Sequence, residues 1–199
     1  MQGGHKSVLD YGTGSAYFLR LLSDCNPNIE IVGFEPIHDM YLKAAEESIK
    51  YKNIKIINKI DFSKKFDRVT CLEVMEHLTA DEQIRILQEC KRLVSDDGEI
   101  IISVPIETGI SSFFKNIIRY TIRQSHAENL KEFFMALFGM KMKRKVSNGY
   151  IYSHVGFRYK DLEKLLFTQK LKIRRRIFSP FNLLGSILNS QVFFVIDPI

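Results

Sequence analysis

The chain has 199 residues, of which 45% are hydrophobic and 26% charged, and its formal net charge at pH 7 is +6. This length suits one domain with a sizeable buried core, and the composition excludes a disordered or fibrous chain. No window holds the roughly 18 uncharged apolar residues of a membrane-spanning helix, and the N-terminus lacks a secretory signal pattern. We therefore expect a single domain over residues 1–199, in the cytoplasm and without a transmembrane segment.

The first two predicted strands each end beside an acidic residue. The apolar run at 7–11 contains Asp10 and leads into the loop Gly12-Thr13-Gly14, and the strand at 30–34 is followed by Glu35. In a doubly wound sheet the carboxyl ends of these two strands lie next to each other. A ligand that contains a nucleoside can therefore span the two carboxylates.

Two ligand classes use such a loop, and residue spacing separates them. A dinucleotide site needs a small third residue where this chain has Tyr17, and Asp10 would repel a pyrophosphate. A cationic ligand is favoured instead. With its D-x-G-x-G-x-A loop and a partner carboxylate at Glu35, the chain resembles a class I S-adenosylmethionine-dependent methyltransferase, with Ala16 in place of the usual third glycine.

Apolar strands and amphipathic helices alternate along the rest of the chain. This order predicts an α/β fold with a doubly wound, Rossmann-like, mostly parallel seven-stranded sheet. The resemblance implies that the last strand runs antiparallel, beside the fifth. The strands are expected at 7–11, 30–34, 54–57, 66–72, 99–104, 171–178 and 191–196, and the helices at 15–24, 38–51, 80–95 and 159–168.

The resemblance also assigns roles at the carboxyl ends of the first three strands. Asp10 would receive the α-ammonium of S-adenosyl-L-methionine, Glu35 both ribose hydroxyls, and Asp61 the exocyclic amine of adenine. Phe62 would pack near the base, and Pro36 would fix the exit from the second strand. The expected cofactor-binding residues are Asp10, Gly12, Thr13, Gly14, Glu35, Pro36, Asp61, Phe62 and Glu73.

The run Glu73-Val74-Met75-Glu76-His77 follows the fourth strand, where the sheet edge faces the methyl group. A helical turn that starts here places Glu73, Glu76 and His77 on one face. His77 could act as a general base, could orient the substrate, or could join a divalent metal site with the two carboxylates. In a purely structural alternative His77 caps the helix and Glu76 is solvated.

The metal alternative has a parallel in known families. The Glu-x-x-Glu-His run resembles the metal-binding run of ubiquinone-pathway O-methyltransferases and of small-RNA 2′-O-methyltransferases, and His154 stands where the latter place a further histidine. Because the run also occurs in relatives without a metal, we expect none here. The catalytic candidates are His77, Glu76 and His154.

Residues 107–150 exceed the usual length of a connection in an α/β fold and are expected to form a helical insertion. Apolar residues recur at helical spacing over 110–122 and 128–138. A cap over the substrate pocket is favoured. The same stripe is compatible with ordinary core packing, or with a helix on a membrane surface where Lys141 to Lys145 touch anionic headgroups.

The acceptor is expected to be a small molecule, or a lipid- or sugar-linked one, methylated at oxygen. Basic segments such as Arg174 to Arg176 leave weak contact with anionic lipid or RNA open. Two alternatives remain at this stage: a metal-assisted RNA 2′-O-methyltransferase, and a non-catalytic subunit that only binds the cofactor.

Overall fold

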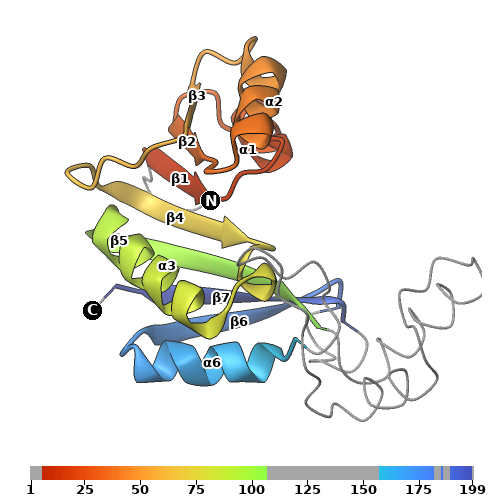
Figure 1. The fold of residues 1–199 in the computed structure, drawn as a ribbon, viewed down its shortest axis with the longest axis vertical. Helices are drawn as coiled ribbons and strands as arrows, with labels where there is room; N and C mark the ends of the chain where they lie inside the picture. The colour runs from red at the N-terminus through yellow and green to blue at the C-terminus, as the bar shows by residue number, and fades with distance from the viewer. Residues whose placement is uncertain (1–5, 107–156, 182–184, 186–188, 199) are drawn as a thin grey trace, which may run out of the picture.

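The computed structural model describes residues 6–106, 157–181, 185 and 189–198 (Figure 1). Its seven strands form one sheet in the order β3-β2-β1-β4-β5-β7-β6. The strands are β1 (Ser7–Tyr11), β2 (Glu30–Phe34), β3 (Ile54–Ile57), β4 (Phe66–Leu72), β5 (Val94–Pro105), β6 (Lys172–Ser179) and β7 (Gln191–Asp197). The helices are α1 (Tyr17–Cys25), α2 (His38–Ser48), the short 3₁₀ helix η1 (Met75–His77), α3 (Ala80–Leu93) and α6 (Tyr159–Thr168).

Strand order and direction confirm the predicted sheet. The chain starts at β1, winds outward through β2 to β3, and returns to β4 on the other side of β1. β7 runs antiparallel to β5 and to β6, while the other pairs are parallel. The strand order reverses between β1 and β4, so the carboxyl ends of these strands border the crevice where doubly wound folds bind ligands.

Helices cover both faces of the sheet. On one face, a Cβ built on Gly33 of β2 would lie 2.6 Å from a side-chain carbon of Leu19 in α1. On the other face, the Tyr11 hydroxyl at the end of β1 donates a hydrogen bond to Glu89 of α3. Helix α3 contacts β4 and β5, and Figure 1 shows α6 along β6. The main apolar core lies under α3, where Leu87, Leu93, Ile100, Ile102 and Phe194 are almost completely buried.

The boundary between α3 and β5 differs from the prediction. The helix ends at Leu93 and the strand begins at Val94, whereas the sequence predicted a helix to residue 95 and a strand from residue 99. Val94 already pairs with Phe66, and the register then shifts before Arg68 pairs with Glu99. Gly98 allows this irregularity, because a Cβ there would lie 2.7 Å from the carbonyl oxygen of Asp67. Strand pairing therefore overrides the turn that Asp96-Asp97-Gly98 suggests.

The predicted insertion at 107–150, its two amphipathic helices and His154 lie outside the described residues. Among the helices that the structure does describe, none is long and apolar enough to cross a membrane.

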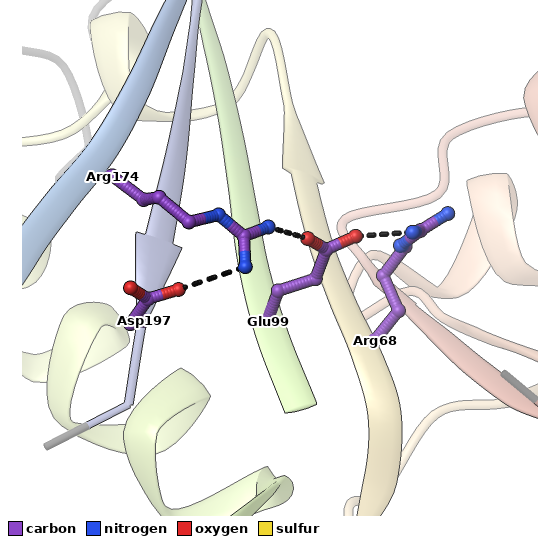
Figure 2. Close-up of polar contacts among 4 residues, drawn as sticks. All are labelled: Arg68, Glu99, Arg174 and Asp197. Carbon is purple, nitrogen blue, oxygen red and sulfur yellow. Dashed lines mark hydrogen bonds and ion pairs between the residues drawn. The ribbon is translucent and has the colours of Figure 1, made fainter. Parts of the chain in front are cut away.

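A network of charged side chains joins four strands, β4, β5, β6 and β7, toward the amino edge of the sheet (Figure 2). The carboxylate of Glu99 on β5 forms ion pairs with Arg68 on β4 and with Arg174 on β6. Arg174 also contacts Asp197 on β7, with 3.1 Å between Nη1 and Oδ1. The side chains of Glu99 and Arg68 are only 10% and 16% exposed, whereas that of Arg174 is 53% exposed. Glu99 is therefore the centre of the network and Arg174 its solvated rim.

We predict that Glu99→Gln lowers the free energy of unfolding by about 3 kcal/mol, because it removes the negative charge that faces the poorly solvated Arg68 guanidinium. Arg174→Ala should cost less than about 1 kcal/mol, since the ion pair that it removes is solvent-exposed. Urea unfolding of both variants measures the difference. Equal losses in the two variants would contradict the central role of Glu99.

Candidate functional site

The loop between β1 and α1 has three residues with left-handed backbone conformation. Gly12, Gly14 and Ala16 have φ angles of 80°, 58° and 57°. The backbone N–H groups of Gly12 and Thr13 both donate to the carbonyl oxygen of Phe34, at 2.8 and 3.0 Å. Ala16 has a left-handed conformation that glycine adopts more easily, and it stands where the resembling family usually has its third glycine. Its side chain is fully buried. The loop is thus tied to the end of β2.

Glu35, directly after β2, completes this connection. Its Oε2 accepts the Gly14 N–H at 2.8 Å, and its Oε1 accepts the Ile37 N–H at 3.0 Å. Glu35 is 4% exposed. Each carboxylate oxygen has a second acceptor position, so both oxygens can still receive hydrogen bonds from a ligand. Glu35 therefore shapes the loop and keeps the capacity predicted for ribose hydroxyls.

Asp10 is a buried carboxyl at the end of β1, in register with Gly33 and Thr70. It is 3% exposed, and its Oδ1 accepts a hydrogen bond from the Thr70 hydroxyl at 2.6 Å. Burial raises the pKa of Asp10 to about 6; the Thr70 hydroxyl opposes this shift and the charge of Glu35 adds to it. A carboxylate in this environment is stabilised by a cationic partner.

The chain turns sharply after β4. Glu73 has a φ of 56°, and its backbone N–H donates to the carbonyl oxygen of Ser103 at 3.1 Å and to the Ser103 hydroxyl at 3.2 Å. The same hydroxyl donates to Oε1 of Glu73 at 2.9 Å. Helical structure begins only at Met75, in η1. The predicted turn that would place Glu73, Glu76 and His77 on one helical face is therefore wrong, because Glu73 is left-handed.

The two remaining residues of the motif differ in exposure. Glu76 is 0% exposed, so the alternative in which it is solvated is also wrong, while His77 is partly exposed. The Gln83 side-chain amide of α3 donates to the carbonyl oxygen of Met75 at 2.7 Å and fixes η1 in place. In the part of the chain that the structure describes, no group of three or more His, Cys, Asp or Glu residues is arranged to hold a metal ion.

Asp61 and Phe62 lie in the connection between β3 and β4. Asp61 is exposed, and its Oδ1 accepts hydrogen bonds from the Ser63 N–H at 3.0 Å and the Ser63 hydroxyl at 2.6 Å, which lower its pKa. The ring of Phe62 lies 4.2 Å from the guanidinium carbon of Arg92. Arg92 is in the last turn of α3, toward the amino edge. The structure therefore does not bring Phe62 together with Asp10 and Glu35.

Sequence reasoning missed Thr70 and Ser103, which contact Asp10 and Glu73. Both are buried polar residues within apolar strands, and each follows β-branched or aliphatic neighbours. A hydroxyl in a buried strand needs a hydrogen-bond partner, so this pattern was the signal that could have identified them.

We predict that Gly12→Ala is more damaging than Gly14→Ala. Both substitutions place a side chain in a left-handed conformation, which costs about 1–2 kcal/mol. At Gly12 the new Cβ would also lie 2.7 Å from Cγ2 of Val74, whereas at Gly14 it would lie 3.9 Å from Cε of Met40. Gly12→Ala should therefore lose roughly 1–3 kcal/mol more in chemical unfolding, because Val74 must move. Equal losses of unfolding free energy in the two variants would show that Val74 moves away from the new Cβ without an energetic penalty.

Known proteins resemble the chain in both sequence and fold. Residues 2–133 match the family model described as a methyltransferase domain. The chain is 27% identical over 171 residues to the tRNA U34 carboxymethyltransferase of Nautilia profundicola, covering 80% of this chain and 53% of that protein. It is 32% identical over 108 residues to the ubiquinone biosynthesis O-methyltransferase of Actinobacillus pleuropneumoniae, covering 49% and 45%. The chain spans about half the length of these curated relatives.

Solved structures match the fold over most of the chain. The PH0226 protein of Pyrococcus horikoshii superposes with a TM-score of 0.63 at 20% identity, covering 98% of this chain and 83% of the other. A SAM dependent methyltransferase from Aquifex aeolicus gives a TM-score of 0.59 at 15% identity, covering 98% and 82%. With its sheet order, its glycine loop and its match to the family model, the chain belongs to the class I S-adenosylmethionine-dependent methyltransferases.

Proposed function

We propose that the chain transfers the methyl group of S-adenosylmethionine to an oxygen atom of a small-molecule acceptor. The observation that carries this proposal is the position of His77, a partly exposed imidazole in η1 directly beyond the carboxyl end of β4. An imidazole suits proton removal from a hydroxyl near neutral pH. The similarity to a ubiquinone biosynthesis O-methyltransferase supports an oxygen target.

The residues around the glycine loop fit the cofactor. The sulfonium of S-adenosylmethionine supplies an activated methyl group, so the protein needs mainly to position the two reactants and exclude water. Asp10 is a buried carboxyl whose charged form needs a cation, and it would receive the α-ammonium. Glu35 would accept the ribose hydroxyls while it continues to hold Gly14. The contact of Asp61 with adenine stays a prediction, because its carboxylate bonds to Ser63 and the adjacent Phe62 lies away from Asp10 and Glu35.

Of the two catalytic candidates in η1, Glu76 and His77, we retain His77. His77 would remove the acceptor proton, whereas Glu76 is fully buried and an acceptor in the crevice would not reach it without a rearrangement of η1. His154 and the capping role of residues 107–150 stay predictions, since they lie outside the described residues.

A second candidate function is methyl transfer to RNA. The chain is similar over 80% of its length to a tRNA U34 carboxymethyltransferase. Residues 158–176 carry eight Lys and Arg against two Asp and Glu, a charge balance that suits a polyanion. These two observations favour RNA as the alternative acceptor class.

Tritiated-methyl S-adenosylmethionine tests these candidates when the protein is incubated separately with metabolite, lipid and RNA fractions. We expect label in a metabolite or lipid fraction, with a roughly 10²–10⁴-fold slower rate for His77→Ala and unchanged cofactor affinity. Label confined to RNA would replace the proposal with the second candidate. Cofactor binding without label in any fraction would indicate a non-catalytic subunit.

The raised pKa of Asp10 predicts a pH dependence of binding. The neutral carboxyl that forms below pH about 6 cannot pair with an ammonium group, so affinity for S-adenosylhomocysteine should fall as the pH decreases. The fall should approach about tenfold per pH unit below the pKa. Calorimetry from pH 5 to 8 measures it. Asp10→Asn should bind weakly and with a flat profile over this range, and an equally steep profile in that variant would exclude Asp10 as the titrating group.

The same shift predicts the stability of the cofactor-free protein. A carboxyl whose pKa is higher in the folded than in the unfolded chain stabilises the fold at low pH, and this contribution is lost as the pH rises from about 4 to 6. Between these values Asp10→Asn should therefore show a smaller decrease in unfolding free energy than the unmodified protein. Denaturant titrations at pH 4.5 and 6.5 compare the two chains.

A further inference from the structure

We infer that Ser103 on β5 is a positioning residue for cofactor binding, whose hydroxyl holds Glu73 in a left-handed conformation and thereby keeps Val74 packed against Gly12. This inference rests on the cofactor binding proposed above and assigns a role to a residue distant from the glycine loop in sequence. Its evidence is a continuous series of contacts from β5 through the end of β4 to the loop after β1.

Glu73 has a strained backbone conformation. Its φ of 56° lies in the region that residues with a side chain rarely adopt. Such a conformation persists only where surrounding contacts impose it, and it is concentrated at functional sites. Glu73 immediately follows β4, at the edge of the sheet that carries Asp10 and Glu35.

Ser103 makes a closed set of hydrogen bonds to Glu73. The Ser103 hydroxyl accepts the Glu73 N–H at 3.2 Å and donates to Glu73 Oε1 at 2.9 Å. The Ser103 carbonyl oxygen accepts the same N–H at 3.1 Å. Ser103 is 1% exposed, so water cannot easily replace these contacts. They fix both the backbone and the side chain of Glu73.

The sequence around Ser103 indicates that strand formation alone does not require a hydroxyl at this position. Its neighbours Ile102 and Val104 are both fully buried, and an apolar residue at 103 would pair equally well with Leu72 and Phe193. Burying a hydroxyl is unfavourable unless it is hydrogen-bonded. The partner of the Ser103 hydroxyl is Glu73, so the pair is one unit.

Contact of Val74 with Gly12 connects Glu73 to the glycine loop. Val74 follows Glu73, and its Cγ2 occupies the space 2.7 Å from where a Cβ of Gly12 would lie. The Gly12 N–H in turn bonds to Phe34, and the Gly14 N–H bonds to Glu35. A shift of Glu73 therefore moves the side chain that packs on the first glycine, and with it the backbone that faces the cofactor.

The experiment compares two variants of nearly equal shape, Ser103→Thr and Ser103→Val, by calorimetry with S-adenosylhomocysteine as the probe. Threonine keeps the hydroxyl and valine removes it. We expect Ser103→Val to bind about three- to tenfold more weakly than Ser103→Thr, as loss of a hydrogen bond implies. Ser95→Ala, at the opposite end of β5, is the matched control and should bind like the unmodified chain.

Glu73→Gly separates positioning from general destabilisation. Glycine relieves the strain of the left-handed conformation, which offsets the loss of the hydrogen bond between Ser103 and the Glu73 carboxylate, so the unfolding temperature should stay nearly unchanged. The variant lacks the side chain that Ser103 holds, and it should therefore bind the probe more weakly. Ser103→Val should then cause no further loss of affinity in the Glu73→Gly background, because Ser103 acts through Glu73. Ser103→Ala provides the same comparison should valine prevent folding.

Three outcomes decide the inference. Equal affinities of Ser103→Val and Ser103→Thr would overturn it, as would an undiminished effect of Ser103→Val in the Glu73→Gly background. If Ser103→Val lowers the unfolding temperature without changing the affinity for S-adenosylhomocysteine, Ser103 has only a structural role, and this result would also overturn the inference. Failure of the unmodified chain to bind S-adenosylhomocysteine would instead contradict the proposed function on which the inference rests.

Discussion

The hydrogen bonds from Glu35 to the backbone of Gly14 and Ile37 are the interaction on which the site depends. They join the end of β2 to the loop after β1, and the Phe34 carbonyl oxygen reinforces the junction by accepting two further N–H groups of that loop. Parallel pairing of β1 with β2 and β4 brings three strand ends together. Without this junction the left-handed loop residues would lack the contacts that compensate for their conformation.

Two acidic residues are buried at this edge, and their surroundings differ. Glu35 satisfies both carboxylate oxygens with backbone donors, whereas Asp10 has the hydroxyl of Thr70 against a strong desolvation penalty. The pKa of Asp10 is therefore raised to about 6, and near neutral pH its charge is destabilising for the fold without a cation. A site that destabilises the free protein and is relieved by a positively charged ligand binds that ligand more tightly.

Much of the fold could be predicted because its signals are local. Apolar strand runs and helical periodicity placed β1, β2, β3, β4 and α6 at their observed bounds. The site was predicted less completely. Asp10 and Glu35 follow from the strand-and-glycine pattern, but the left-handed Glu73 does not, because its conformation depends on Ser103, thirty residues away. Phe62 was misplaced for the same reason: its ring lies against Arg92 of α3, a contact that adjacent residues do not encode.

Carboxylates at the two edges of the sheet have different partners. Those at the amino edge form ion pairs that stabilise the fold, and those at the carboxyl edge are proposed to bind the ligand. At the amino edge, Glu99 is neutralised by Arg68 and Arg174, and this network ties β4, β5 and β6 together (Figure 2). At the carboxyl edge, Asp10 accepts a hydrogen bond from the Thr70 hydroxyl and Glu35 accepts hydrogen bonds from the backbone N–H groups of Gly14 and Ile37. Paired charges at one edge hold the strands in register, and that register positions the strand ends at the other edge, where Asp10 is the residue proposed to receive a cationic group. Because the charged network lies on β4 to β7 whereas Asp10 lies on β1 and Glu35 follows β2, loss of the network should weaken binding only through the fold, whereas changes at Asp10 act on the ligand directly.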